Sequence, residues 1–190
     1  MNIWAGRMVE SSPIKSAEPG PFSLVVEDLR SHREGLLAQG FWALLVFRLS
    51  APRKHVKNRL LRGVWRVGNV LGQKIIEVLT GITLAEGASI GRRVIIEHHS
   101  GIIVHGNAVI GDECVLRQGV TIGNRSLDDP AGAPTLGRGV NVGAGAKIIG
   151  RVHIGDYASI GANAVVLSDV PPGALAVGVP AVVKSKRVQL

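Results

Sequence analysis

The sequence is dominated by an aliphatic residue that recurs at every sixth position over residues 84–170. The thirteen members of this series are Leu84, Ile90, Ile96, Val104, Ile110, Leu116, Ile122, Leu136, Val142, Ile148, Ile154, Ile160 and Val166. A period of six fits neither the 3.6-residue period of an α-helix nor the alternation of an ordinary strand. It is typical of a hexapeptide β-helix, a solenoid of short strands and turns. At three rungs per coil, thirteen rungs predict a little over four coils of a triangular prism.

The regions around this repeat divide the chain into four parts. Residues 1–21 are rich in Ser, Pro and Gly and are expected to form a flexible arm. Residues 22–81 show helical spacing, with a break predicted at Gly40, a second helix over 41–49 and one or two further helices over 56–79, closed by Gly81. The β-helix domain is expected over 82–172, with Pro171, Pro172 and Gly173 stopping the coil. Residues 173–190 form the C-terminal tail.

Charge is concentrated just before the repeat. Residues 48–77 contain eight Lys and Arg against one acidic residue, which gives +7 of the formal +8 of the whole chain. The repeat is nearly neutral, which argues against a nucleic-acid-binding solenoid. The basic helices over 48–77 are open to three interpretations: a solvated face, docking onto an acidic partner, or contact with an anionic membrane surface helped by Trp42 and Trp65.

The first residues, the longest apolar run and the cysteine count all bear on the cellular compartment of the protein. Residues 1–20 do not resemble a signal peptide, and the best apolar run is too short to span a bilayer. One cysteine, Cys114, excludes an internal disulfide and favours a reducing compartment. Because Cys114 stands at a small-residue position of its rung, it is predicted to pack in the core. We expect a cytoplasmic protein, with a peripheral position at the inner face of the membrane as the alternative.

Two interruptions of the repeat are candidate functional loops. The spacing is eight between Ile96 and Val104, and fourteen between Ile122 and Leu136. Extra residues in a regular solenoid must bulge outward, and loops on a rigid scaffold commonly carry function.

Assigning the three faces in turn places the rungs of Ile96, Leu116 and Val142 on one face. His98 then lies beside Gln118 and Ala144, at a coil spacing of about 4.8 Å. A histidine that titrates near neutral pH is a natural general base for an acceptor hydroxyl. The alternative is that His98 and His99 are ordinary surface histidines.

Several segments together resemble a known family, the serine acetyltransferases. These segments are Ile90-Gly91-Arg92 to Glu97-His98, Ser100-Gly101-Ile102, Gln118 to Gly123, Gly143 to Ile148, and Gly178-Val179-Pro180-Ala181. The resemblance covers roughly residues 80–182 without a gap. It implies a left-handed parallel β-helix and an acetyl-CoA-dependent O-acetyltransferase.

The resemblance also implies roles for individual residues. His98 matches the catalytic base and Glu97 an acidic residue that holds the acceptor, with Gln118, His99 and His105 as further acceptor-binding candidates. The candidates for the acetyl-CoA groove are Gly123, Asn124, Ala144, Gly145, Gly161 and Ala162. On charge alone, Lys184 of the basic tail would suit the CoA phosphates. No metal is expected. The family pools its sites between subunits, which implies a homotrimer here, with pairing into a dimer of trimers as an open alternative.

The chain departs from the family at the positions that bind the amino-acid acceptor. The carboxylate that orients the family's catalytic histidine falls on Thr83, a second histidine and an arginine fall on Ala133 and Gly132, and a glutamate falls on Gly106. An acceptor without the ammonium and carboxylate of L-serine, such as a sugar or polysaccharide hydroxyl, is therefore favoured over L-serine itself.

Two other functions compete with this interpretation. One is a non-catalytic hexapeptide scaffold, in keeping with the lost acceptor residues. The other is a metal site that draws on His98, His99, His105 and His153 across neighbouring subunits.

Overall fold

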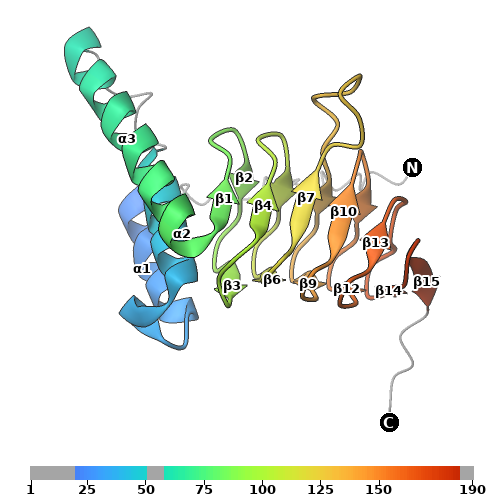
Figure 1. The fold of residues 1–190 in the computed structure, drawn as a ribbon. Helices are drawn as coiled ribbons and strands as arrows, with labels where there is room; N and C mark the ends of the chain where they lie inside the picture. Colours follow the sequence, from blue (N-terminus) through green and yellow to red (C-terminus); the bar gives the residue numbers. More distant parts are fainter. Residues whose placement is uncertain (1–19, 51–57, 185–190) are drawn as a thin grey trace, which may run out of the picture.

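The structure, a computed structural model, is a parallel β-helix with a group of helices packed on its N-terminal end (Figure 1). It describes residues 20–50 and 58–184. The arm predicted over residues 1–21 lies, but for its last two residues, outside this description.

Three α-helices and a short 3-10 turn precede the solenoid. They are α1 (Pro21–Ser31), η1 (Gly35–Leu37), α2 (Gln39–Ser50) and α3 (Arg59–Thr80). The Asn58 side chain caps α3 by accepting from the backbone N–H groups of Leu60 and Leu61, and Gly81 ends it in the left-handed conformation, as predicted. The break predicted at Gly40 lies earlier, between Ser31 and Gln39, and Gly40 is inside the first turn of α2, which covers the helix predicted over 41–49. A Cβ at that position would collide with the backbone of Ile96, so this glycine allows α2 to approach the β-helix closely.

Fifteen short strands follow among the described residues. They are β1 (Ile82–Leu84), β2 (Ser89–Ile90), β3 (Ile95–Glu97), β4 (Ile102–Val104), β5 (Val109–Ile110), β6 (Val115–Arg117), β7 (Thr121–Gly123), β8 (Thr135–Leu136), β9 (Asn141–Val142), β10 (Lys147–Ile149), β11 (His153–Ile154), β12 (Ser159–Ile160), β13 (Val165–Val166), β14 (Leu175–Val177) and β15 (Val182–Lys184). They form three sheets: A (β1, β4, β7, β10, β13), B (β2, β5, β8, β11) and C (β3, β6, β9, β12, β14, β15). All neighbours pair in parallel except β14 and β15, which pair antiparallel. The chain passes from sheet A to B to C and back to A in each coil.

The solenoid is longer than the repeat predicted. Sheet A has five strands, one for each coil, and sheet C continues through β14 beyond the stop expected at Pro172. Pro171, Pro172 and Gly173 instead form one more corner, in which Gly173 N–H donates to Asp156 O and Ser159 N–H then pairs with Ala174 O. Proline and glycine are compatible with the tight turn of a β-helix corner, so the pattern marked a corner and not an end.

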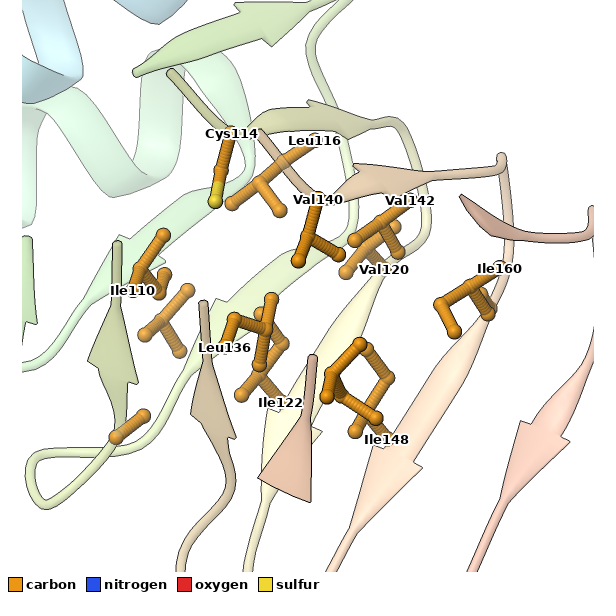
Figure 2. Close-up of a cluster of buried hydrophobic side chains, with 14 of the residues drawn as sticks. Ile110, Cys114, Leu116, Val120, Ile122, Leu136, Val140, Val142, Ile148 and Ile160 are labelled. Atoms are coloured by element: carbon orange, nitrogen blue, oxygen red, sulfur yellow. The ribbon is translucent and has the colours of Figure 1, made fainter. Parts of the chain in front are cut away.

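The rung residues point into the prism and fill it (Figure 2). Leu116, Ile122, Leu136 and Ile148 are each at most 1% exposed. Full burial of such a side chain contributes about 1.5–3 kcal/mol. Cys114 lies among them as predicted, and burial raises the pKa of its thiol to about 11.

A buried polar network fastens the helices to the first coil. The Arg48 guanidinium pairs with Asp28 at 3.0 Å and donates to the carbonyl oxygens of Ile90 and Gly91 at 2.6 and 2.5 Å. The Nδ1 atom of His32 lies 2.7 Å from Asp28 O, and the Nε2 atom accepts a hydrogen bond from Ile96 N–H at 3.2 Å. This pattern fixes the neutral tautomer that is protonated at Nδ1. The helical region is thereby held against strand β3, which precedes His98.

Candidate active site

Residues His98, Gln118, Ala144 and Ala162 occupy successive coils of one corner of the prism. We name this turn from sheet C to sheet A the C–A corner; it comprises residues 98–101, 118–120, 143–146 and 161–164. Ile96 pairs with Leu116, and Leu116 with Val142, so the prediction that their rungs share a face is confirmed. Backbone hydrogen bonds then join the corner from coil to coil: Gly119 N to Ser100 O at 2.9 Å, Gly145 N to Gln118 O at 2.8 Å and Asn163 N to Ala144 O at 2.8 Å.

His98 and His99 form a bulge where the first coil has two residues more than the next. Both side chains are exposed. His98 has φ +63° and Ser100 has φ +89°, a left-handed backbone that non-glycine residues adopt uncommonly and that is frequent at functional sites. The bulge is anchored at its base, because Ser100 N–H donates to Thr80 O at the end of α3 at 2.8 Å. His98 is therefore presented outward from a fixed position.

Glu97 is held by an arginine of the next coil. Its carboxylate lies 3.0 Å from the Nε of Arg117, and the two residues are register partners on β3 and β6. The sequence contains the signal for this pair, since Arg117 follows Glu97 by the same twenty positions that separate His98 from Gln118.

A cleft of about 630 Å³ opens beside the bulge, between the helices and the first coil. One wall is formed by Glu97, His98 and His99, and the other includes His32, Arg33, Glu34 and Gln39. No sequence pattern indicated that Arg33, Glu34 and Gln39 would face His98, because no repeat relates the helices to the coils. The cleft offers charged and amide groups that can bind the hydroxyl groups of a ligand.

Farther along the same corner the side chains are small. Ala144 and Gly145 stand in the third coil, and Gly161 and Ala162 in the fourth. Gly145 has φ +72°, and a Cβ there would collide with the Asn163 side chain. Such small side chains let an extended ligand approach the backbone closely.

The remaining predicted site residues lie elsewhere in this subunit. Gly123 ends β7, so Gly123 and Asn124 stand at the turn from sheet A to sheet B, at the opposite end of sheet A from Ala144. His105 lies at the same turn of the preceding coil, where its Nδ1 accepts from Asn107 N–H at 3.1 Å. Lys184 ends β15, the outermost strand of sheet C. One subunit therefore does not bring the predicted CoA residues together.

The positions where the chain departs from the family that it resembles have no charged side chain that could bind an amino acid. Gly132 is buried, Ala133 packs against the core and Gly106 is half-buried. Thr83 lines a separate cavity of about 220 Å³ together with Lys74 and Glu77 of α3. The pKa of Glu77 is lowered, chiefly by its hydrogen bond with Lys74 and in smaller part by the Thr83 hydroxyl.

The histidines considered for a metal site do not gather within the subunit. His98 and His99 lie at the C–A corner, His105 at the turn after sheet A, and His153 on β11 of sheet B. Within residues 20–50 and 58–184, no three His, Cys, Asp or Glu side chains are grouped so that they could hold a metal ion.

Comparison with known proteins gives one consistent result. Residues 133–168 match the model of the bacterial transferase hexapeptide family (six repeats). The chain is 41% identical over 143 residues to serine acetyltransferase of Helicobacter pylori strain 26695, covering 75% of this chain and 80% of that protein. It is also 40% identical over 129 residues to the putative colanic acid biosynthesis acetyltransferase WcaB of Escherichia coli K12, covering 67% of this chain and 79% of that one.

Longer relatives match over part of their length. Serine acetyltransferase of Mycobacterium tuberculosis is 40% identical over 127 residues, which are 65% of this chain and 56% of that enzyme. Among solved structures, a serine acetyltransferase in complex with CoA superposes with a TM-score of 0.72 at 30% identity, covering 88% of this chain and 70% of that one.

Proposed function

The chain belongs to the serine acetyltransferase family of hexapeptide-repeat acyltransferases, which are acetyl-CoA-dependent O-acetyltransferases, and from this premise we propose that it acetylates a carbohydrate hydroxyl with His98 as general base. The observation that carries the proposal is the C–A corner. It places His98, next to a polar cleft, in line with the small residues around Ala144 and Ala162.

The reaction is a direct transfer between two bound substrates. An imidazole nitrogen of His98 takes the proton of the acceptor hydroxyl as the oxygen attacks the thioester carbonyl. The carbon–sulfur bond then breaks, and the CoA thiolate leaves and takes up the proton from the imidazolium. The products are an O-acetyl ester and CoA with a free thiol. Glu97, held by Arg117, lies next to His98 in sequence and contributes an acceptor for hydroxyl groups of the substrate.

A carbohydrate fits the acceptor cleft better than free serine. The volume of the cleft, about 630 Å³, is within the usual range for small-molecule sites and would accommodate a group much larger than an amino acid. The side chains of Arg33, Glu34 and Gln39 supply donors and acceptors. Gly106, Gly132 and Ala133, which lie outside this cleft in the subunit, have no side chain that could pair with the charges of serine.

The donor site supports a trimer. Gly123 ends a strand of sheet A whereas Ala144 precedes one, and this separation supports a pantetheine groove formed between two copies of the chain. We therefore propose a homotrimer with three shared acetyl-CoA sites. Sedimentation equilibrium should give three times the monomer mass, or six times if two trimers pair.

The test is release of free CoA thiol from acetyl-CoA in the presence of a panel of mono- and oligosaccharides or of L-serine. His98→Ala should lower kcat by roughly 10²–10⁴ while the KM for acetyl-CoA changes little, because removal of a general base acts on the chemical step. His153→Ala is the matched control, since His153 is exposed on sheet B, away from this corner.

Three outcomes would contradict the proposal. An unchanged rate in His98→Ala would rule out His98 as the general base. Turnover with L-serine and none with any saccharide would show that the acceptor is L-serine and not a carbohydrate. Failure to bind acetyl-CoA in calorimetry would favour a scaffold without catalytic function.

A further inference from the structure

Helix α3 carries a long apolar stripe that faces away from the protein. Its members recur at helical spacing and are each 57–82% exposed: Leu60, Val64, Val67, Leu71, Ile75 and Val78. The opposite side of the helix is the one that packs on the body, since Asn69, Gln73 and Ile76 are partly buried and Gly72 faces Val46 of α2. Figure 1 shows α3 reaching beyond the first coil and the other helices. The stripe is therefore accessible along its whole length.

The polar side of the protruding half of α3 is purely basic. Arg59, Arg62 and Arg66 are exposed, and the sequence of the helix contains no carboxylate before Glu77, which pairs with Lys74 at 2.8 Å. Trp65, 43% exposed, stands at the edge between the apolar stripe and the arginines, the position that indoles prefer at a lipid–water interface.

We propose that α3 binds the surface of an anionic membrane, lying in the plane of the interface with its apolar stripe among the lipid chains. A strongly amphipathic helix with cations on one face and leucine, valine and tryptophan on the other has this property. The phosphate groups of anionic lipids would match the uncompensated arginines. No helix within the described ranges is long and apolar enough to cross a membrane.

A second copy of the chain fits α3 less well as the occupant of this stripe. A helix–helix seam is a narrow stripe, whereas Leu61 and Leu79 widen the apolar face of α3. The seam would also have to accommodate Lys74, which lies one helical turn from both Leu71 and Val78. The arginines would find no acidic residues on the same stretch of a partner's α3.

The experiment measures binding of the full-length protein to vesicles by sedimentation. Vesicles of phosphatidylcholine alone are compared with vesicles that contain about 30% of the anionic lipid phosphatidylglycerol. We expect binding to the anionic vesicles, a large loss on the neutral ones, and weakening by salt because surface charges are screened. The readout does not use turnover, so it is independent of the proposed acetyl transfer.

Two pairs of variants locate the contact. Leu71→Glu should weaken binding at least roughly tenfold, the effect of losing one buried leucine, whereas Leu127→Glu, in an exposed loop far from α3, should not. Arg62→Gln/Arg66→Gln should weaken binding roughly thirty-fold, and Arg30→Gln/Arg151→Gln, which removes the same charge elsewhere, much less. Unchanged far-UV circular dichroism verifies that the variants fold.

The proposal is overturned if the wild-type protein binds neither type of vesicle, or binds both equally. It is also overturned if Leu71→Glu binds like the wild type. If vesicle binding is absent and Leu71→Glu instead reduces the size of the assembly in sedimentation velocity, the stripe is covered by a second copy of the chain.

Discussion

Replacing Arg48 by methionine tests how the helical region is held on the β-helix. The Arg48 side chain is 6% exposed and its partner Asp28 is 1% exposed. Among the described residues, Asp28 Oδ1 already has no hydrogen-bond partner, so the guanidinium at Oδ2 is the main compensation for the buried charge. The same guanidinium is a hydrogen-bond donor to two carbonyl groups of the first coil, at Ile90 and Gly91.

The expected cost is set by the carboxylate that is left behind. Removing one partner of a buried ion pair typically destabilises a protein by about 3–5 kcal/mol. Methionine fills most of the volume of arginine, so little of this cost should come from a cavity. For a chain of this length the melting temperature should fall by roughly 6–20 °C. In Asp28→Leu/Arg48→Met both charges are gone, and the cost should shrink to about 1–2 kcal/mol because no buried charge remains unpaired.

The pH dependence gives a second readout. Burial raises the pKa of the Asp28 carboxyl in spite of Arg48, and loss of Arg48 should raise it further. A carboxyl whose pKa is higher in the folded state than in the unfolded state costs stability above its folded pKa, and the cost disappears as it becomes protonated. Arg48→Met should therefore regain stability relative to the wild type as the pH is lowered towards 4.

The assays are urea unfolding at pH 7 and pH 4 and hydrogen exchange of the helices. Exchange should accelerate first in α1 and α2, because their anchor to the first coil is lost. The argument is refuted if the single and double variants cost the same, or if Arg48→Met costs less than about 1 kcal/mol.

Two further predictions concern other titratable groups. Arg138 first and Arg93 second hold the pKa of Glu113 at about 2, so this half-buried carboxylate stabilises the fold above its unfolded pKa near 4.5 and the contribution is lost as the pH falls towards 2. Glu113→Gln should flatten the acid side of the stability curve measured by urea unfolding at a series of pH values. The Cys114 thiol, buried and with its pKa raised to about 11, should not react with a disulfide reagent at pH 8 until urea unfolds the chain. Fast labelling of the native protein would mean that the coil opens locally.

The sequence was most informative where one coil predicts the next. The alignment of His98 with Gln118 and Ala144 follows from the rung residues, because Ile96, Leu116 and Val142 mark the register of successive coils even where a loop is inserted between them. Sequence reasoning was wrong where one residue type has two uses. Gly40 can end a helix or allow close packing, and a Pro-Pro-Gly run can stop a coil or turn a corner, and nothing local distinguishes these uses.

The sequence alone determined the β-helix, its core, the bulge at His98 and Cys114 as a core residue, because a solenoid repeats contacts that are local in the chain. Only the tertiary structure decided how the helices meet the first coil, since Arg48 and Ile90 are brought together by no repeat. That meeting places Arg33, Glu34 and Gln39 opposite His98 and turns the apolar stripe of α3 outward. Periodicity therefore specified the scaffold, while the cleft beside His98 and the exposed helix depend on contacts between distant segments.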